Sequence, residues 1–270
     1  TIDPTTGTVI YNASNGTYSY TGGTTISSGT LQVGTANMLP SAGAVTVASG
    51  ATFDVNASQS ILTLTNSGTL DIGGNKLTVS GAGGCTIGGA TLSTSGGELD
   101  FTGGQAVGWT SSAFANGKVT LTNATLNLSN AASIGILTNT SNGVLALGSN
   151  ILTLDGTGTS VINGTVSAGG SGGITINNSG AAVTWNPTTV TDWTGTVTLT
   201  DGTLSADADK VDKGTYSIGT GKVLNINGAG TVASATATTI SGAGGVTIDP
   251  TSGTVIYDGS NGTYSYTGGT

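Results

Sequence analysis

The sequence has 270 residues, of which only 7% are charged: five are Lys or Arg, 13 are Asp or Glu, none is His, and the net charge is −8. This balance argues against nucleic-acid binding, because phosphate recognition needs clustered Lys and Arg. It also disfavours an anionic membrane surface, and without a run of 18 apolar residues we expect no membrane insertion. With 48 Gly and four Pro, and with Thr, Ser and Asn abundant, the composition predicts an all-β protein.

The chain opens with a segment that returns near its end. Residues 1–24 recur as residues 247–270, with differences only at Thr6/Ser252, Asn12/Asp258 and Ala13/Gly259. A fixed period of this kind is the mark of a repeat architecture. We therefore expect residues 1–270 to be a slice of a tandem array with a 246-residue period, folded as one continuous β-solenoid.

Short alternating runs come after the opening segment in close succession. They are AVTV (44–47), ATFDV (51–55), ILTL (61–64), TLDI (69–72) and KLTV (76–79). Each predicts a strand of four or five residues with one face inward, bounded by Gly, Asn or Ser. Their spacing suits either hairpins or the three sides of a β-solenoid coil. Coils of roughly 20 residues would give about a dozen coils per 246-residue unit, rising on the order of 55–60 Å.

Degenerate repeats occur inside the 246-residue unit. A Gly-Gly-x-Thr-Ile motif closes residues 81–87, 170–176 and 242–248. It divides the chain into approximate sub-repeats 1–83, 84–172 and 173–244, with the next copy starting at 245–270. An aromatic residue before Thr comes after each motif, and the alignment makes Trp109, Trp193 and Tyr266 (the counterpart of Tyr20) equivalent.

Two stretches resemble a known family. Residues 241–270 and 17–55 carry GAGG before an alternating strand, then TYSYTGGTT, SGTLQVG and ASGATFDV. These phrases resemble the autotransporter-associated β-strand repeat of bacterial passenger domains and large surface adhesins. The resemblance implies an all-β, right-handed parallel β-helix that is exported and serves as a stalk or adhesive surface. The family pattern contains no catalytic residues, so none is carried over.

Candidate catalytic groups are few. Without His, neither Ser nor Cys has an imidazole partner. Glu98 and Asp100 alternate along one strand, and a pair of carboxylates is what a polysaccharide-degrading β-helix would need. The aligned copies hold no acids at these positions, so we interpret the pair as two solvated side chains. We expect no enzyme activity, no catalytic residue and no cofactor site.

Two further groups of residues are candidate sites. Asp207, Asp209 and Asp212 could hold Ca²⁺ weakly, but two Lys intervene, and a solvated loop without a metal site is the preferred interpretation. Cys85 aligns with Ile174 and Val246, which predicts a small buried hydrophobic residue instead of a reactive thiol.

The aromatic and Thr residues raise the question of surface recognition. We favour packing roles for Trp109, Trp193 and Tyr20; the alternative is an aromatic platform for sugars. Thr-x-Thr pairs suggest ice binding as a further hypothesis, but a flat ice-binding face needs such pairs in register on every coil. The pairs at Thr63/Thr65, Thr120/Thr122 and Thr196/Thr198/Thr200 are far apart in sequence, so we expect no such face.

These observations predict a structural repeat module of a long, secreted bacterial surface fibre or adhesin. We expect an extracellular, cell-surface location and a mechanical role in cell–cell contact or biofilm. The expected partners are neighbouring copies end to end, with possible lateral fibre association and possible contact with surface glycans. The alternative is a glycan-binding or polysaccharide-degrading β-helix protein.

Overall fold

The computed structural model describes residues 1–15, 18, 20–92, 96–111, 113–168, 172–191, 193–233 and 237–270. Strands make up 55% of the described residues and helices 2%, and the strands stack as the parallel coils of a β-solenoid of about 12 turns. The predicted all-β class and the parallel β-solenoid are therefore confirmed. The chain forms two compact units, Thr1–Ile134 and Gly135–Thr270.

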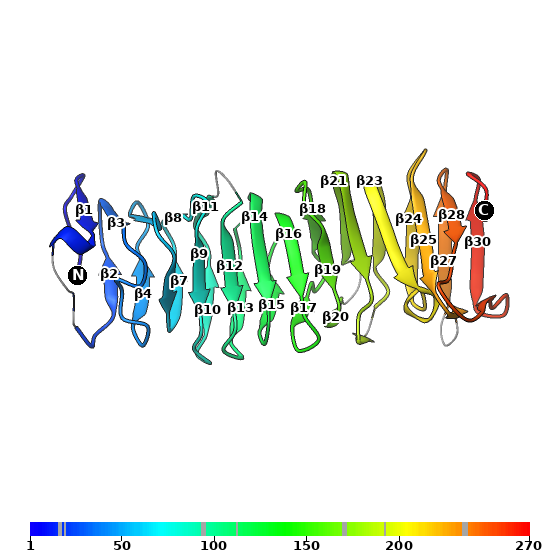
Figure 1. Ribbon diagram of the computed structural model, residues 1–270, viewed down its shortest axis with the longest axis horizontal. Helices are drawn as coiled ribbons and strands as arrows, with labels where there is room; N and C mark the ends of the chain where they lie inside the picture. The colour runs from blue at the N-terminus through cyan, green and yellow to red at the C-terminus, as the bar shows by residue number, and fades with distance from the viewer. Residues whose placement is uncertain are drawn as a thin grey trace. The chain divides into compact units, whose positions relative to one another are not determined.

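Unit 1 contains three sheets of parallel strands (Figure 1). The first has the order β1 (Thr8–Tyr11), β3 (Thr30–Val33), β5 (Thr52–Asp54), β8 (Thr69–Asp71) and β11 (Ala90–Leu92). The second runs through β2 (Thr24–Ile26), β4 (Ala44–Val47), β7 (Thr63–Asn66), β10 (Cys85–Ile87), β13 (Ala106–Trp109) and β15 (Thr125–Leu128). The third contains β6 (Gln59–Ile61), β9 (Lys76–Val79), β12 (Glu98–Phe101) and β14 (Ala113–Leu121). A short 3-10 helix, η1 (Ala13–Asn15), comes after β1.

Unit 2 has longer strands, some of which pair with two partners on the same edge. One ladder holds β17 (Val144–Ala146), β20 (Thr165–Ser167) and β22 (Thr189–Thr191). A second holds β18 (Ile151–Leu154), β21 (Gly173–Trp185), β23 (Thr196–Asp207), β24 (Gly214–Ile218), β27 (Thr238–Gly242) and β30 (Gly262–Tyr266). A third ladder is formed by the C-terminal (far) parts of β21 and β23 together with β19 (Ser160–Ile162), β25 (Val223–Gly228) and β28 (Gly245–Ile248). The remaining elements are β16 (Ala132–Asn139), η2 (Ala208–Lys210), and the pair β26 (Gly230–Val232) and β29 (Val255–Tyr257).

The register of these ladders gives the length of a coil. Partners in successive coils are as close in sequence as Thr52 and Thr69 and as far apart as Gly230 and Val255. The predicted coil of roughly 20 residues lies inside this range. The alternative interpretation of the strand spacing, hairpins, is wrong for the ladders of the described residues, because their strands pair in parallel.

Alternation along each strand builds the core. In β4 the burial alternates between exposed and buried positions, as expected for strands with one face inward. Stacked coils then align inward side chains into columns: Leu31, Phe53 and Leu70 are direct neighbours in register and are fully buried. Burying a side chain of this size stabilises the fold by about 1.5–3 kcal/mol, so the columns hold the coils together.

The Gly-Gly-x-Thr-Ile motif does not keep one place around the coil. In unit 2, Ile174 of the second copy pairs with Val197 in the near part of β23. Val246 of the third copy pairs with Leu224, which itself pairs with Leu204 in the far part of β23. Gly170 and Ser171, which open the second copy, lie outside the described residues. The motif marks a strand that suits any side of the coil, not a fixed side.

A buried amide holds the loop between β3 and β4. Gln59 is 2% exposed, and its side chain makes four hydrogen bonds to backbone groups. Its Nε2 donates to the carbonyls of Thr35 (2.8 Å) and Ala57 (2.9 Å), and its Oε1 accepts from the N–H groups of Met38 (2.9 Å) and Leu39 (3.2 Å). The Gln59 amide thus supplies hydrogen-bond partners to backbone groups of the loop between β3 and β4, where no neighbouring strand provides them.

Replacing this amide is expected to loosen the loop. Gln59→Leu should lower the free energy of unfolding by about 2 kcal/mol, because four backbone groups in half-buried or buried residues lose their partner. Hydrogen exchange of the Met38 and Leu39 amides should accelerate more than that of core strands. Gln105, which is fully buried and makes two such bonds, offers the comparison Gln105→Leu with a smaller loss. Unchanged exchange at Met38 would contradict this role.

Candidate functional site

The two acids singled out by the sequence lie in a ladder of charges. Lys76, Glu98 and Lys118 occupy the same register position on β9, β12 and β14. Lys118 Nζ lies 3.3 Å from Glu98 Oε1, and Lys76 Nζ lies 2.6 Å from Asp100 Oδ2. We call Lys76, Glu98, Asp100 and Lys118 the charge ladder.

The interpretation of these acids as solvated was wrong for Asp100, and Glu98 is half-buried. The Asp100 residue is only 7% exposed, and the Glu98 side chain is 21% exposed. The two carboxylates do share one side of the strand, as expected, but lysines on both neighbouring coils cover them. The sequence alignment of sub-repeats could not find this arrangement, because it depends on the register between coils.

The surroundings of Glu98 and Lys76 favour their charged forms. Burial alone would raise the pKa of Glu98, but the Thr120 hydroxyl, which donates to Oε1 at 2.5 Å, and the charge of Lys118 bring that pKa below its ordinary value. The hydrogen bond to Asp100 raises the pKa of Lys76. A general acid for glycoside cleavage needs a raised pKa, so Glu98 is arranged as an ion-pair partner.

This pairing predicts a pH dependence of stability. A carboxylate whose pKa is lowered by folding contributes stability above its ordinary pKa, near 4.5, and that contribution is lost as the pH falls through the lowered value. The difference in the free energy of unfolding between wild type and Glu98→Gln should therefore be largest at neutral pH and shrink below pH 4.5. Urea denaturation at a series of pH values measures it. A difference that is independent of pH would contradict the pairing.

The three aspartates considered for calcium are not grouped in the structure. Asp207 precedes η2, and its backbone N–H donates to Asn186 Oδ1 at 2.9 Å. Asp209 lies 3.3 Å from Lys210 Nζ. Across the part of the chain that the structure describes, no three His, Cys, Asp or Glu side chains are grouped to hold a metal ion.

Cys85 is a core residue, as the sequence predicted. It lies in β10, is 3% exposed and forms no disulfide. Burial raises the pKa of its thiol to about 12, so the reactive thiolate is scarce at neutral pH.

The tryptophans are buried, but they are not equivalent. Trp109 ends β13 and is fully buried, whereas Trp193 is 4% exposed and lies between β22 and β23. Tyr20 precedes β2 and is half-buried. A third tryptophan, Trp185, ends β21, is fully buried and packs 5.7 Å from Trp193 between ring centroids. The repeated phrase AVGW (106–109) and AVTW (182–185) was the sequence signal for it.

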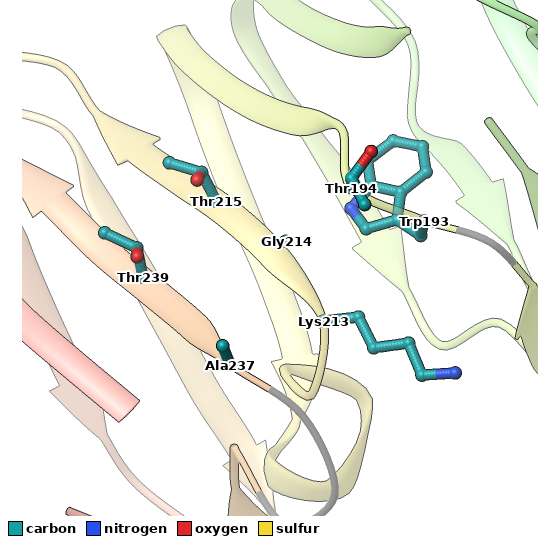
Figure 2. Close-up of a pocket in the computed structure, with 7 residues that line it drawn as sticks. All are labelled: Trp193, Thr194, Lys213, Gly214, Thr215, Ala237 and Thr239. Carbon is teal, nitrogen blue, oxygen red and sulfur yellow. The ribbon is translucent and has the colours of Figure 1, made fainter. Parts of the chain in front are cut away.

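A groove of about 500 Å³ borders Trp193 (Figure 2). Thr215 and Thr239 line one side of it, from β24 and β27. Figure 2 shows Lys213 extending away from these threonines, and its Nζ donates to the Val190 carbonyl at 2.9 Å. The indole lies largely beneath the surface, so the groove presents threonine hydroxyls instead of an aromatic platform.

These threonines belong to a regular array. Outward positions on β23, β24, β27 and β30 are in register and carry a hydroxyl at two sites per strand. We call this array the hydroxyl face; its members are Thr196, Thr198, Thr215, Ser217, Thr239, Ser241, Thr263 and Ser265. Neighbouring strands place the hydroxyls about 4.8 Å apart, and alternate residues about 6.6 Å apart.

The expectation that hydroxyl pairs are out of register was wrong for this part of the chain. The pair Thr196/Thr198 is in register with three further hydroxyl pairs on β24, β27 and β30. By contrast, Thr63 and Thr65 pair with Ala44 and Thr46, so only one of the two positions carries a hydroxyl on both strands. The sequence search missed the array because it required Thr-x-Thr, whereas three of the four pairs read Thr-x-Ser, and because coils of unequal length hide the register.

Comparisons with known proteins found no matching family model, no matching curated protein and no matching solved structure. Among the described residues, no helix has the length and apolar character needed to cross a membrane.

Proposed function

We propose that this chain is a structural repeat module of a long, secreted bacterial surface fibre or adhesin. One observation carries the proposal: parallel coils stack over a chain whose sequence returns after 246 residues. In such a solenoid each coil contacts only its neighbours, so length grows by adding units. Backbone ladders and apolar columns supply stiffness, and the uncharged hydroxyl face supplies contact.

The surroundings of the aromatic residues and acids support the scaffold over its two rivals. A glycan-binding module would rest on exposed aromatic rings, but Trp109 and Trp193 are buried. A polysaccharide-degrading enzyme would need a proton donor, but the pKa of Glu98 is lowered. The resemblance to the autotransporter-associated repeat points the same way, toward the bacterial cell surface.

Immunogold labelling of intact source cells tests the location. Antibodies against this chain should label fibres outside the outer surface, and label confined to the interior of the cells would contradict the proposal.

Charge substitutions test the contact role. A triple Lys variant carries three like charges in one column of the hydroxyl face, through Thr196→Lys, Thr215→Lys and Thr239→Lys. Because like charges repel each other, two such faces should no longer associate. Thr46→Lys, Thr65→Lys and Thr86→Lys form the matched control, since these exposed residues make an equally regular column on β4, β7 and β10. Cell–cell aggregation should fall with the first set only. Equal aggregation in both variants would contradict a contact role for the hydroxyl face.

The hydroxyl face also favours one second candidate, adsorption to ice. Two columns of hydroxyls are in register on four successive strands, which gives this part of the chain the regular spacing that a lattice-matched surface needs. An ice recrystallisation assay decides it: inhibition that the triple Lys variant of the hydroxyl face abolishes would support ice binding, and unimpeded crystal growth with the wild-type chain would exclude it.

A further inference from the structure

The repeated segment of residues 1–24 and 247–270, which we call the seam segment, makes two of the same side-chain pairings in both copies, although η1 of the first copy corresponds to a turn at residues 259–261. In the first copy the rings of Tyr11 and Tyr18 stack with centroids 4.3 Å apart. In the second, Tyr257 and Tyr264 are 4.9 Å apart and meet edge to face. The hydroxyl of Tyr20 bonds that of Thr24 at 2.6 Å. The corresponding contact, Tyr266 to Thr270, is 2.8 Å.

The first copy of the seam segment pairs with residues downstream of it. Strand β1 pairs in parallel with β3, with Val9 beside Leu31 and Tyr11 beside Val33. Ile2 forms a parallel bridge to Ile26. These partners are fully buried, so the seam segment forms an ordinary coil with the next coil along the chain.

The second copy of the seam segment pairs with residues upstream of it. In β29, Tyr257 pairs with Val232 of β26. In β30, Tyr264 pairs with Ile240 of β27. Two of these upstream partners, Val232 and Ile240, are fully buried.

Each copy therefore pairs through the edge that the other leaves open. In the described residues β1 pairs only with β3, and β29 only with β26. The inward rings Tyr11 and Tyr257 remain half-buried, whereas their counterparts one coil further in, Val33 and Val232, are fully buried. Open parallel edges over half-buried rings invite another strand.

We propose that consecutive units join through one shared seam segment, without linker or hinge. The strand equivalent to β3 of the next unit pairs with β29, placing Leu31 of that unit beside Val255 and its Val33 beside Tyr257. Its Ile26 pairs with Ile248. The proposal rests on the tandem array of the proposed function and names its end-to-end partner as a second copy of this chain's own coils.

An extended chain that reads residues 1–270 and then directly residues 25–246 tests the junction. Hydrogen exchange with mass spectrometry can monitor the middle seam segment separately, because Ser252, Asp258 and Gly259 distinguish its peptides from those of residues 1–24. Exchange of residues 247–270 should slow by at least about tenfold relative to the original chain, because new coils cover it. Equally fast exchange in the two chains would overturn the proposal.

A control in the appended part separates stacking from mere extra length. Leu31→Asn with Val33→Asn in the appended residues alone should restore fast exchange of the middle seam segment. Full protection in this variant would overturn the register.

A disulfide provides a readout that does not depend on that variant's folding. Ile10 and Gln32 are neighbours across β1 and β3, so Ile256→Cys should cross-link to Gln32→Cys of the appended part under mild oxidation, at an ordinary disulfide separation. Asp54→Cys, one strand further on, should not cross-link to it. Preferential linkage to position 54 would contradict the junction. Absence of cell-surface labelling would contradict the proposed function, but it would not change the exchange and cross-linking results that test the junction.

Discussion

Gly89→Ala is expected to destabilise the protein by at least about 3 kcal/mol, as an overpacked site in contact with backbone. Gly89 lies at the corner between β10 and β11, directly against Gly68 at the equivalent corner of the preceding coil. A Cβ at position 89 would lie 1.7 Å from the Gly68 carbonyl oxygen and 2.7 Å from its carbon. No side chain can rotate away, so the coils themselves would have to separate.

Gly84→Ala is the matched control for this substitution. Nothing lies within 4 Å of a Cβ built at Gly84, and the residue is exposed on the same coil. Its effect on the free energy of unfolding should stay within about 0.5 kcal/mol. Urea denaturation of both variants measures the difference, and equal stabilities would show that close stacking at the corners is not needed.

Trp109→Ala is expected to cost about 3–5 kcal/mol, the range for removing a large buried aromatic side chain. Trp109 is fully buried and lies in register between Ile87 and Leu128. Its ring centroid is 6.3 Å from that of Phe114, and its Nε1 donates to the Ser111 carbonyl at 2.8 Å. The variant loses contacts with the coils on both sides.

Trp109→Phe separates ring packing from the hydrogen bond. It keeps an aromatic ring in the column and loses the indole N–H, so its cost should be clearly below that of Trp109→Ala. Denaturant titration monitored by circular dichroism measures both. A loss below about 1 kcal/mol for Trp109→Ala would place this residue at the surface and would favour the aromatic platform for sugars.

The stacking of parallel coils could be predicted because it depends on local sequence. Alternation in runs such as residues 44–47 places Val45 and Val47 inward, and frequent Gly permits tight corners. Burial of Cys85 could be predicted from its place in such a run. These features depend on neighbours in sequence, and they need no knowledge of which coil lies next to which.

Features that depend on register could not be predicted. Coils differ in length, so nothing in the sequence alone aligned Lys76, Glu98 and Lys118 or the hydroxyl face. Gln59 was missed for a related reason: a polar residue in a strand pattern reads as outward, and only the folded coil shows that its amide replaces missing backbone partners. The alignment of Trp193 with Trp109 assumed a similar number of residues between the Gly-Gly-x-Thr-Ile motif and the aromatic residue in each sub-repeat. Coils of unequal length do not keep that number constant.

Imaging the native assembly by electron microscopy tests the central claim most directly. If the chain is a unit of a stacked solenoid array, fibres from the source cells should show an axial repeat on the order of 55–60 Å, which is about a dozen coils at strand spacing. Isolated globules, or fibres without that repeat, would contradict it.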